Sequence, residues 1–317
     1  HFPAHPGPQQ YLHRVIGALA PETSNARSYF KRTVNRNTTR IATTDIQSTV
    51  GNIPVIKRGS TGFRPVMHGG IMYIEPQPIE IDDYFSAVED DDWERATGMG
   101  KNQIVDEKLA RWAKLVRNTT KALCIQAHRG KIDYMMQAGS EMVRYEVDYG
   151  DVDGIERDKA LSGLTLTDFI DDATEMEQEI RKRGIGGAIE FIASSEYFKQ
   201  LVTISANQTK FPVEFTADGM NIAGFKVLRN NDTYTDLVGG TKTVKKLVEE
   251  RELMARAVDA GQELDFLRID DTVQRQAVPL YSFTKERGDQ RGTDLYVKSK
   301  PFPLINVKGI EILKYAS

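Results

Sequence analysis

The sequence is poor in the residues that carry most enzyme chemistry. It has a single cysteine, Cys124, so no disulfide can form within the chain, and this fits a reducing compartment such as cytoplasm. Only five histidines are present, and three of them, His1, His5 and His13, lie close to the N-terminus. Few histidines therefore remain for a metal cluster or a general base. No apolar run approaches the roughly 20 residues that a membrane span needs, and no secretory signal is visible at the N-terminus.

The chain also lacks an excess of charge of one sign. Its 42 basic and 45 acidic residues give a formal net charge of −3, which argues against a dedicated nucleic-acid binder. Local basic patches could still make weak contact with nucleic acid. The length of 317 residues, with 40% hydrophobic and 27% charged residues, is sufficient for one large core or two ordinary domains.

Catalytic and phosphate-binding motifs are missing as well. The stretch GSTG at 59–62 resembles a phosphate-binding loop, but it is followed by Phe63, Arg64 and Pro65 and then by a second apolar run. A phosphate loop needs a helix N-terminus at that point, because the helix supplies aligned N–H groups. The acidic cluster EDDDW at 89–93 has no visible metal-binding partner and is typical of a solvated turn.

The N-terminal region predicts an extended arm. Residues 1–30 are rich in Pro, His, Gln and Ala and cannot form a packed core by themselves. Residues 28–46 add basic side chains to β-favouring Thr and Val. This segment is either a solvated edge or an arm that lies over a neighbouring subunit or faces nucleic acid.

A long hairpin is predicted after the arm. Residues 53–58 and 70–75 both look like strands, and roughly a dozen residues between them form its loop. A two-stranded hairpin is marginally stable in water and needs a surface on which to lie. The pattern therefore indicates contact with another subunit and not nucleotide binding.

Residues 101–129 give the strongest helical pattern. Apolar positions recur at spacings of 4, 3, 4, 3 and 4 residues, and Gly130 follows as a C-cap. A helix of this length needs a long partner surface. We expect that surface to be a hairpin within 131–150, with one strand at 132–136, a turn at 138–140 and alternating residues at 142–149.

The remaining elements predict a mixed second lobe, and so an α+β protein. We expect a helix at 167–183, capped by Thr167 and ended by Gly184, and a helix capped by Ser194 that ends at Val202. Residue propensities favour a helix at 243–261, and a strand at 253–258 is the alternative. The other expected β segments are 188–193, a hairpin at 211–229 turning near Asp218-Gly219, 277–283, 293–299 and 304–314.

An arm, a protruding hairpin and the lack of an active site together suggest an assembly subunit. The sequence resembles the major capsid proteins of lambda-like tailed phages, the capsid protein E family, over nearly the whole chain after about Asn25. The segments that carry the resemblance, in the same order, are NIPVIKRGSTGFRPV, YIEPQPIEIDDYF, KALCIQAHRGKIDY, RYEVDYG and GTDLYVKSKPFPLINVKGIEILKY.

The resemblance implies the Hong Kong 97 (HK97)-like capsid fold. In that fold residues 1–47 would be the N-arm and 48–84 the extended E-loop. Residues 85–150 and 285–317 would form the peripheral domain, with a spine helix at about 101–129. Residues 151–284 would form the axial domain around the five-fold and six-fold vertices.

The implied function is structural and not enzymatic, without cofactor or metal. Many copies would assemble through pentamers and hexamers into an icosahedral shell that encloses the double-stranded DNA of a tailed phage. Assembly would take place in the host cytoplasm, with portal, decoration and scaffolding proteins as candidate partners, weak contact with packaged DNA and no membrane. Two alternatives stay open: an encapsulin-type compartment shell, and a phosphate-binding enzyme that uses residues 59–64.

The same resemblance selects three groups of contact residues. For the E-loop they are Lys57, Arg58, Phe63, Arg64 and Met67. For the N-arm they are Tyr29, Phe30, Lys31, Arg32, Arg36 and Arg40. For packing of the spine helix they are Val105, Leu109, Trp112, Val116 and Leu123.

Overall fold

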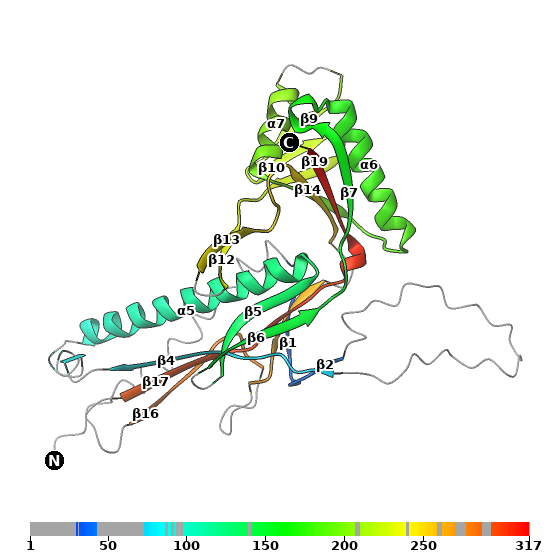
Figure 1. Ribbon diagram of the computed structural model, residues 1–317. Coiled ribbons are helices and arrows are strands. Elements are labelled where there is room, and N and C mark those ends of the chain that lie inside the picture. The colour runs from blue at the N-terminus through cyan, green and yellow to red at the C-terminus, as the bar shows by residue number, and fades with distance from the viewer. Residues whose placement is uncertain are drawn as a thin grey trace, which may run out of the picture. The chain divides into compact units, whose positions relative to one another are not determined.

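The computed structural model contains two compact units of mixed helix and strand (Figure 1). The first comprises residues 1–41, 75–123 and 263–303, and the second 42–74, 124–262 and 304–317. The residues that the structure describes are 30, 32–42, 73–85, 88–89, 92, 95, 98–138, 141–206, 210–238, 241–258, 262–269, 277–286 and 293–316. The predicted α+β class is confirmed.

The first unit is built around a long helix on a three-stranded sheet. Helix α5 (Gly98–His128) confirms the predicted spine helix, and its first part belongs to this unit. The sheet has the order β16 (Tyr281–Glu286), β17 (Thr293–Ser299), β4 (Ile79–Phe85), and both pairings are antiparallel. Its apolar positions alternate along each strand, so one face packs against the helix.

The prediction that α5 packs its buried side against the hairpin at 131–150 is wrong. Leu109, Trp112 and Val116 pack against Leu280, Leu295 and Val297, with Ile79 and Ile81 beside them, and not against the hairpin that follows the helix. That hairpin exists as β5 (Lys131–Ala138) and β6 (Glu141–Asp148), paired with each other in an antiparallel register. The true partner strands are far away in sequence, so local alternation could not reveal them.

A second small sheet in the first unit joins distant parts of the chain. Its order is β1 (Thr33–Arg36), β15 (Glu263–Leu267), β18 (Pro301–Leu304). Strand β1 runs parallel to β15, with Thr33 opposite Leu264 and Arg36 opposite Leu267.

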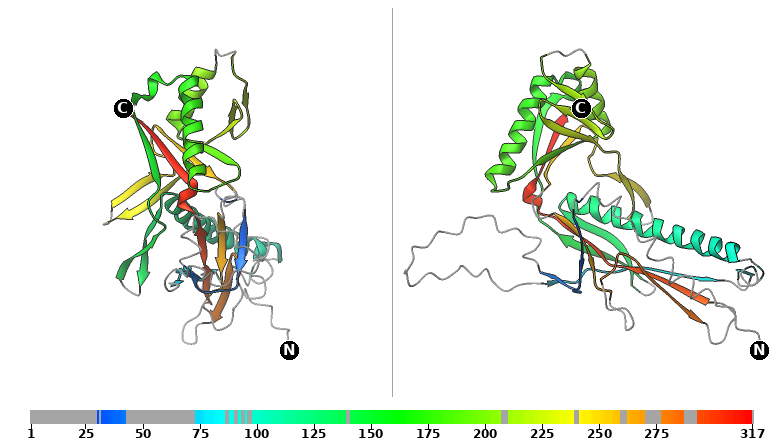
Figure 2. Two further views of the ribbon diagram at one scale, coloured as in Figure 1. Left: turned by 90° about the vertical axis from the view of Figure 1, so that its right-hand side faces the viewer. Right: turned by 180° about the vertical axis from the view of Figure 1, so that it is seen from behind.

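The second unit contains a seven-stranded sheet with two helices. The strand order is β7 (Asp153–Ala160), β19 (Ile310–Ala316), β14 (Glu252–Ala257), β8 (Ile189–Ala193), β11 (Phe225–Arg229), β10 (Gly219–Ile222), β9 (Val213–Phe215). Helices α6 (Leu166–Lys182) and α7 (Ser195–Ser205) pack against the sheet, as Figures 1 and 2 show. In the core Phe169, Phe191 and Phe225 meet edge to face.

Polar contacts also fix α6 to the C-terminal strand. The hydroxyl of Tyr315 donates to Asp172, which also accepts from Arg157. At the end of the helix the Arg183 guanidinium donates to the carbonyl oxygens of Lys308 (3.2 Å) and Ile310 (3.1 Å) and contacts Glu311. Each partly buried charge therefore has a partner, as burial requires.

Three further sequence predictions need correction. The cap of α6 is Thr165, whose side chain accepts from the N–H of Asp168, and not Thr167. At 243–261 the favoured helix is wrong and the alternative strand at 253–258 is confirmed, because the described residues of this segment, 243–258, lie in β13 (Thr241–Lys246), in β14 and in the link between them. All six residues of β14 are buried between β19 and β8, so tertiary pairing outweighs their helical propensity.

The third correction concerns residues 211–229. They form three strands, with a second turn at Ala223 and Gly224, and not one hairpin. The strand at 188–193, the Ser194 cap and the helix end at Gly184 are confirmed. Strands β16, β17 and β19 lie near the three predicted C-terminal β segments.

Two further two-stranded sheets complete the described elements. Strands β12 (Thr233–Val238) and β13 pair in an antiparallel hairpin, and β2 (Ile41–Ala42) pairs with β3 (Tyr73–Ile74). Short 3-10 turns lie at Leu161–Gly163 and Val307–Gly309. None of the helices in the described segments is long and apolar enough to cross a membrane.

The two units are divided at different positions from the predicted domains. Residues 263–303 group with α5, whereas 304–317 join the seven-stranded sheet through β19. The predicted boundaries had assigned 151–284 to one domain and 285–317 to the other.

Replacing Gly130 with Ala should destabilise the chain. Gly130 has φ +90°, and a Cβ there would lie 2.4 Å from the carbonyl oxygen of Gly150. The left-handed conformation alone costs an L-residue about 1–2 kcal/mol. We expect the melting temperature of the purified full chain, measured by circular dichroism, to fall by several degrees.

Gly186→Ala is the matched control, because a Cβ at Gly186 would meet nothing within 4 Å. It should change the melting temperature by about a degree or less. Equal losses in both variants would contradict the assigned role of Gly130.

The stability of α6 should depend on the ionisation of Asp168. Hydrogen bonds from Lys159 and then from Thr165 lower the pKa of Asp168 to about 2. Because the folded pKa is depressed, this contribution is present above the ordinary pKa of 3.8 and is lost as the pH falls through about 2. Denaturant unfolding of the chain and of Asp168→Asn should differ at pH 5, and the difference should shrink toward pH 2. A difference that grows on acidification would show that the linkage is wrong.

Candidate assembly interface

The described part of the arm is attached to the body of its own chain. Phe30 and Ile41 are each only 1% exposed. The carbonyl oxygen of Arg32 accepts from the N–H of Leu264, and that of Thr38 from the N–H of Arg268, both at 3.0 Å. Thr and Val in β1 suit an extended, half-buried strand. The described part of the arm is therefore held in a fixed position beside β15.

An ion-pair cluster strengthens this attachment. Arg36 Nη2 donates to Glu263 Oε1 at 2.6 Å, and Arg36 Nε lies 2.5 Å from Asp265 Oδ2. The side chain of Asp265 is fully buried. Burial by itself would lower the pKa of Arg36, but Asp265 and Glu263 raise it above its ordinary value. The guanidinium is therefore charged at every relevant pH, which a buried carboxylate requires.

Two other predicted arm residues also have partners within the chain. Arg32 Nε lies 3.3 Å from Glu263 Oε2, and Arg40 Nε lies 3.6 Å from Glu75 Oε2. Both arginines are largely exposed, so these pairs contribute little to stability. Contact of the arm with a neighbouring subunit stays a prediction, and Tyr29 and Lys31 lie outside the described residues.

The five predicted E-loop residues, from Lys57 to Met67, also lie outside the described residues. The structure does describe the two ends of that segment. Strand β2 precedes it and β3 follows it, and the two strands pair with each other. The chain therefore leaves and returns at one place, as a long hairpin requires.

The strand that follows this hairpin is fixed to the spine helix. Trp112 Nε1 donates to Asp83 Oδ2 of β4 at 3.0 Å. Lys108 Nζ donates to the carbonyl oxygen of Tyr84 at 3.0 Å and lies 2.9 Å from Glu89 Oε1. Sequence reasoning missed Asp83 and Lys108. The only available signal was that a buried tryptophan N–H needs an acceptor.

The predicted spine residues are mostly brought together. Leu109, Trp112 and Val116 share one buried cluster, and Leu123 is buried as well. The side chain of Val105 lies outside what the structure describes.

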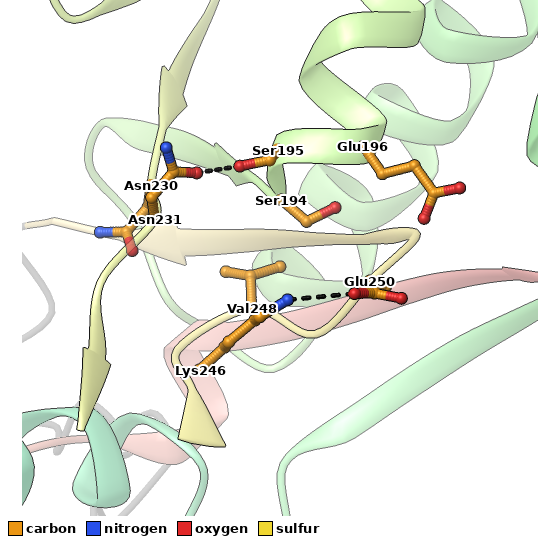
Figure 3. Close-up of a pocket in the computed structure, with 8 residues that line it drawn as sticks. All are labelled: Ser194, Ser195, Glu196, Asn230, Asn231, Lys246, Val248 and Glu250. Atoms are coloured by element: carbon orange, nitrogen blue, oxygen red, sulfur yellow. Dashed lines mark hydrogen bonds and ion pairs between the residues drawn. The ribbon is translucent and has the colours of Figure 1, made fainter. Parts of the chain in front are cut away.

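One cavity in the second unit is lined mostly by polar side chains. It has a volume of about 320 Å³ and lies where α7 begins (Figure 3). Lys246 Nζ there donates to Glu250 Oε1 at 3.2 Å, and Ser195 contacts the side-chain amide of Asn231. The full set of lining residues is Ser194, Ser195, Glu196, Asn230, Asn231, Lys246, Val248 and Glu250. Without a histidine or a thiol in this set, the serines have no evident base to activate them.

Among the described residues, the side chains of Cys124 and His128 are buried. Burial raises the pKa of the Cys124 thiol well above its ordinary range. Burial, and then the charge of Arg256, lower the pKa of His128 to about 3, so its imidazole is neutral at physiological pH. Across the described residues no three His, Cys, Asp or Glu side chains are arranged to hold a metal ion.

Similarity to solved structures establishes the fold. A candidate capsid protein from a prophage of E. coli CFT073 aligns with 96% of this chain and 97% of its own, at 15% identity and a TM-score of 0.62. A virus-like particle from Pyrococcus furiosus aligns with 96% of this chain and 98% of its own (10% identity, TM-score 0.49). Mycobacterium phage Patience aligns over 97% and 88% (10% identity, TM-score 0.48). The fold is the HK97-like capsid fold.

A comparison with curated protein sequences finds no match. The model of the family described as phage major capsid protein E, in contrast, matches residues 19–309, which is most of the chain. The chain therefore belongs to the phage major capsid protein E family, and it is a structural, non-enzymatic protein of the tailed-phage capsid shell, which is built from many copies of it.

Proposed function

We propose that this chain assembles through pentamers and hexamers into an icosahedral shell that encloses the double-stranded DNA genome of a tailed phage. The observation that best supports the proposal is the fixed base of the predicted E-loop. Its two ends pair as β2 and β3, and its return strand β4 is held to α5 through Trp112 and Asp83. A long hairpin on a rigid base can reach a neighbouring subunit in a defined direction.

The domains of the HK97-like fold follow from this assignment. Residues 1–47 serve as the N-arm and 48–84 as the E-loop, whose return strand β4 joins the sheet of the peripheral domain. Helix α5 with strands β16 and β17 forms the body of the peripheral domain, and the seven-stranded sheet with α6 and α7 forms the axial domain. A mixed sheet covered by helices is a suitable rigid body for packing around a vertex.

The chemistry of the E-loop predicts what it contacts. Phe63 and Met67 are apolar anchors, whereas Lys57, Arg58 and Arg64 pair with acidic groups of the neighbouring subunit. No acidic residue lies between Asp45 and Glu75, so the loop cannot neutralise these cations itself. In a closed shell every subunit has neighbours on all sides, so each E-loop meets a partner subunit.

The remaining partners belong to the same proposal. Shells form in the cytoplasm of the bacterial host, a portal protein occupies one vertex, and scaffolding and decoration proteins act during or after assembly. These partners are inferred from the family, and the near-neutral net charge of −3 suits a container that holds DNA without clamping it.

Purified chain should form closed shells or capsomer rings, and these should depend on the E-loop. Phe63→Ala combined with Met67→Ala removes two anchors, each worth about 1–2 kcal/mol. The concentration needed for assembly should therefore rise at least about tenfold. Negative-stain electron microscopy with sizing chromatography measures both the particles and this threshold.

The unassembled double variant should melt at the same temperature as the parent chain, which controls for misfolding. A parent chain that stays a monomer at all salt concentrations would contradict the shell. Normal assembly of the folded double variant would contradict the role of the loop.

Arg36→Gln should loosen the arm. The change removes the guanidinium from Glu263 and from the buried Asp265, at a cost of about 1–3 kcal/mol. We expect faster proteolysis of the arm in the unassembled chain and shells that dissociate at a lower urea concentration. Arg32→Gln is the control: its side chain is 74% exposed, so its effect should stay within about 0.5 kcal/mol. Equal effects of the two changes would argue against the Arg36 attachment.

A further inference from the structure

The outer face of the β16–β17–β4 sheet carries a row of aromatic rings. Leu295 and Val297 of β17 point to α5, so the residue between them, Tyr296, points to the opposite face. Strand register places Phe283 directly opposite Tyr296, and Tyr281 lies two residues before Phe283 on the same face. We name these three rings the aromatic row.

The rings of the aromatic row are stacked and only partly covered. The ring centroids lie 5.6 Å apart between Tyr281 and Phe283 and 4.8 Å apart between Phe283 and Tyr296. All three residues are partly exposed, and Tyr84, on the same face of β4, is 52% exposed. A contiguous exposed aromatic surface of this kind is typical of an interaction site.

Acidic groups of β4 border the aromatic row. Asp82 lies directly opposite Tyr296, is exposed and has no ion-pair partner among the described residues. Glu80 on the same face is paired with Lys298 at 3.2 Å, and the Lys298 ammonium lies 5.7 Å from the centroid of the Phe283 ring. A ligand for this surface therefore needs apolar groups and no negative charge.

The N-terminal sequence HFPAHPGP, residues 1–8, has this chemistry. Pro3 and Pro6 form a Pro-x-x-Pro pattern, and each proline restricts the residue before it to extended or polyproline II backbone. In polyproline II every third residue returns to the same side, so these two prolines would lie on one side, roughly 9 Å apart. No acidic residue precedes Glu22, so the segment is not repelled by the carboxylates of β4.

The Pro-x-x-Pro pattern and the aromatic row match in chemistry and in length. Segments in polyproline II bind to surfaces lined by aromatic rings, because prolines pack on the rings and the preformed helix loses little entropy. The two centroid separations, 5.6 and 4.8 Å, limit the row to a length of about 10 Å. This is close to the spacing of roughly 9 Å between Pro3 and Pro6.

The proline-rich segment is attached to the unit that contains the sheet. Phe30, which is buried, and β1 belong to the same compact unit as β16, β17 and β4. Residues 9–29, between Pro8 and Phe30, span up to roughly 70 Å when extended, whereas α5 is about 46 Å long. The connection therefore permits docking within one chain, and it raises the local concentration of the segment at the sheet.

We propose that residues 2–8 dock on the aromatic row of their own chain and hold the N-terminal arm there in the unassembled subunit. The docking does not depend on the proposed shell, but it has a consequence for assembly. An arm that is docked on its own sheet cannot lie over a neighbouring subunit. Release of the segment is then a step in assembly, and the docked state delays it.

Disulfide trapping in the unassembled full-length chain tests the contact. Ala4→Cys places a thiol between the two prolines, and Asp82→Cys places one beside the aromatic row. The native Cys124 is buried and does not compete. Under mild oxidation with copper phenanthroline, we expect an intramolecular disulfide, which a non-reducing gel shows as a monomer of altered mobility.

Ala4→Cys combined with Lys114→Cys is the matched control. Lys114 is exposed on α5, and α5 covers the other face of the sheet. Without docking at that position, the disulfide should form at least about tenfold more slowly than with Asp82→Cys. Equal rates for the two cysteine pairs would overturn the inference.

The contribution of the prolines and the rings is measured in the same assay. Pro3→Ala with Pro6→Ala, or Tyr296→Thr, should slow formation of the Asp82→Cys disulfide at least about fivefold, because each removes part of the proline–ring contact. Threonine retains the strand propensity of tyrosine at this position. Pro21→Ala, outside the pattern, should leave the rate unchanged. A rate that does not respond to loss of both prolines would contradict the assigned contact.

Two further outcomes separate docking within the chain from contacts between chains. A disulfide-linked dimer in place of the intramolecular product would show that the segment docks on a second copy, and the inference would be wrong. Pro3→Ala with Pro6→Ala should form shells at a concentration no higher than the parent chain needs, and a higher one would contradict the delay of assembly. A parent chain that forms the intramolecular disulfide but no shell would contradict the proposed function and not the docking.

Discussion

The packing of one helix stripe against one sheet determines the geometry of the first unit. Leu109, Trp112 and Val116 pack on strands β4 and β17 and on Leu280, just before β16. Hydrogen bonds from Trp112 to Asp83 and from Lys108 to the carbonyl oxygen of Tyr84 fix the register of helix and strand. Because a buried indole N–H without an acceptor is costly, this register has few alternatives. Strand β4 is also the continuation of the predicted E-loop. A shift in this packing would therefore change the direction in which the loop leaves the subunit.

Elements with strong local patterns could be predicted from the sequence. The spacing of apolar residues by three and four positions from Leu109 to Leu123 predicted the spine helix. The alternation of apolar and polar residues predicted the β5–β6 hairpin. At 243–261 the favoured helix was wrong and the alternative strand was right, because Leu253 and its neighbours favour a helix locally, whereas burial between β19 and β8 requires a strand. The cap of α6 was misplaced by two residues, because two threonines precede the helix and only the Asp168 contact selects Thr165.

The candidate interface was less predictable, and for a different reason. Arg32 and Arg36 of the arm were identified from the sequence, but their partners Glu263 and Asp265 are more than 220 residues away, and nothing near Arg36 indicates them. The same holds for Asp83, whose partner Trp112 lies 29 positions further along the chain. Charged contacts of this kind depend on tertiary neighbours, whereas apolar periodicity is a property of the segment itself.

The parallel pairing of β1 with β15 has a consequence for the order of events during synthesis. Arg36 and Glu263 are separated by 227 positions, so the arm has no docking strand until most of the chain has left the ribosome. Closing so long a loop is also entropically unfavourable until the rest of the body has folded. The arm is consequently among the last elements to be positioned. A chain that ends before β15 thus lacks the strand that holds the arm and cannot present it in its final place.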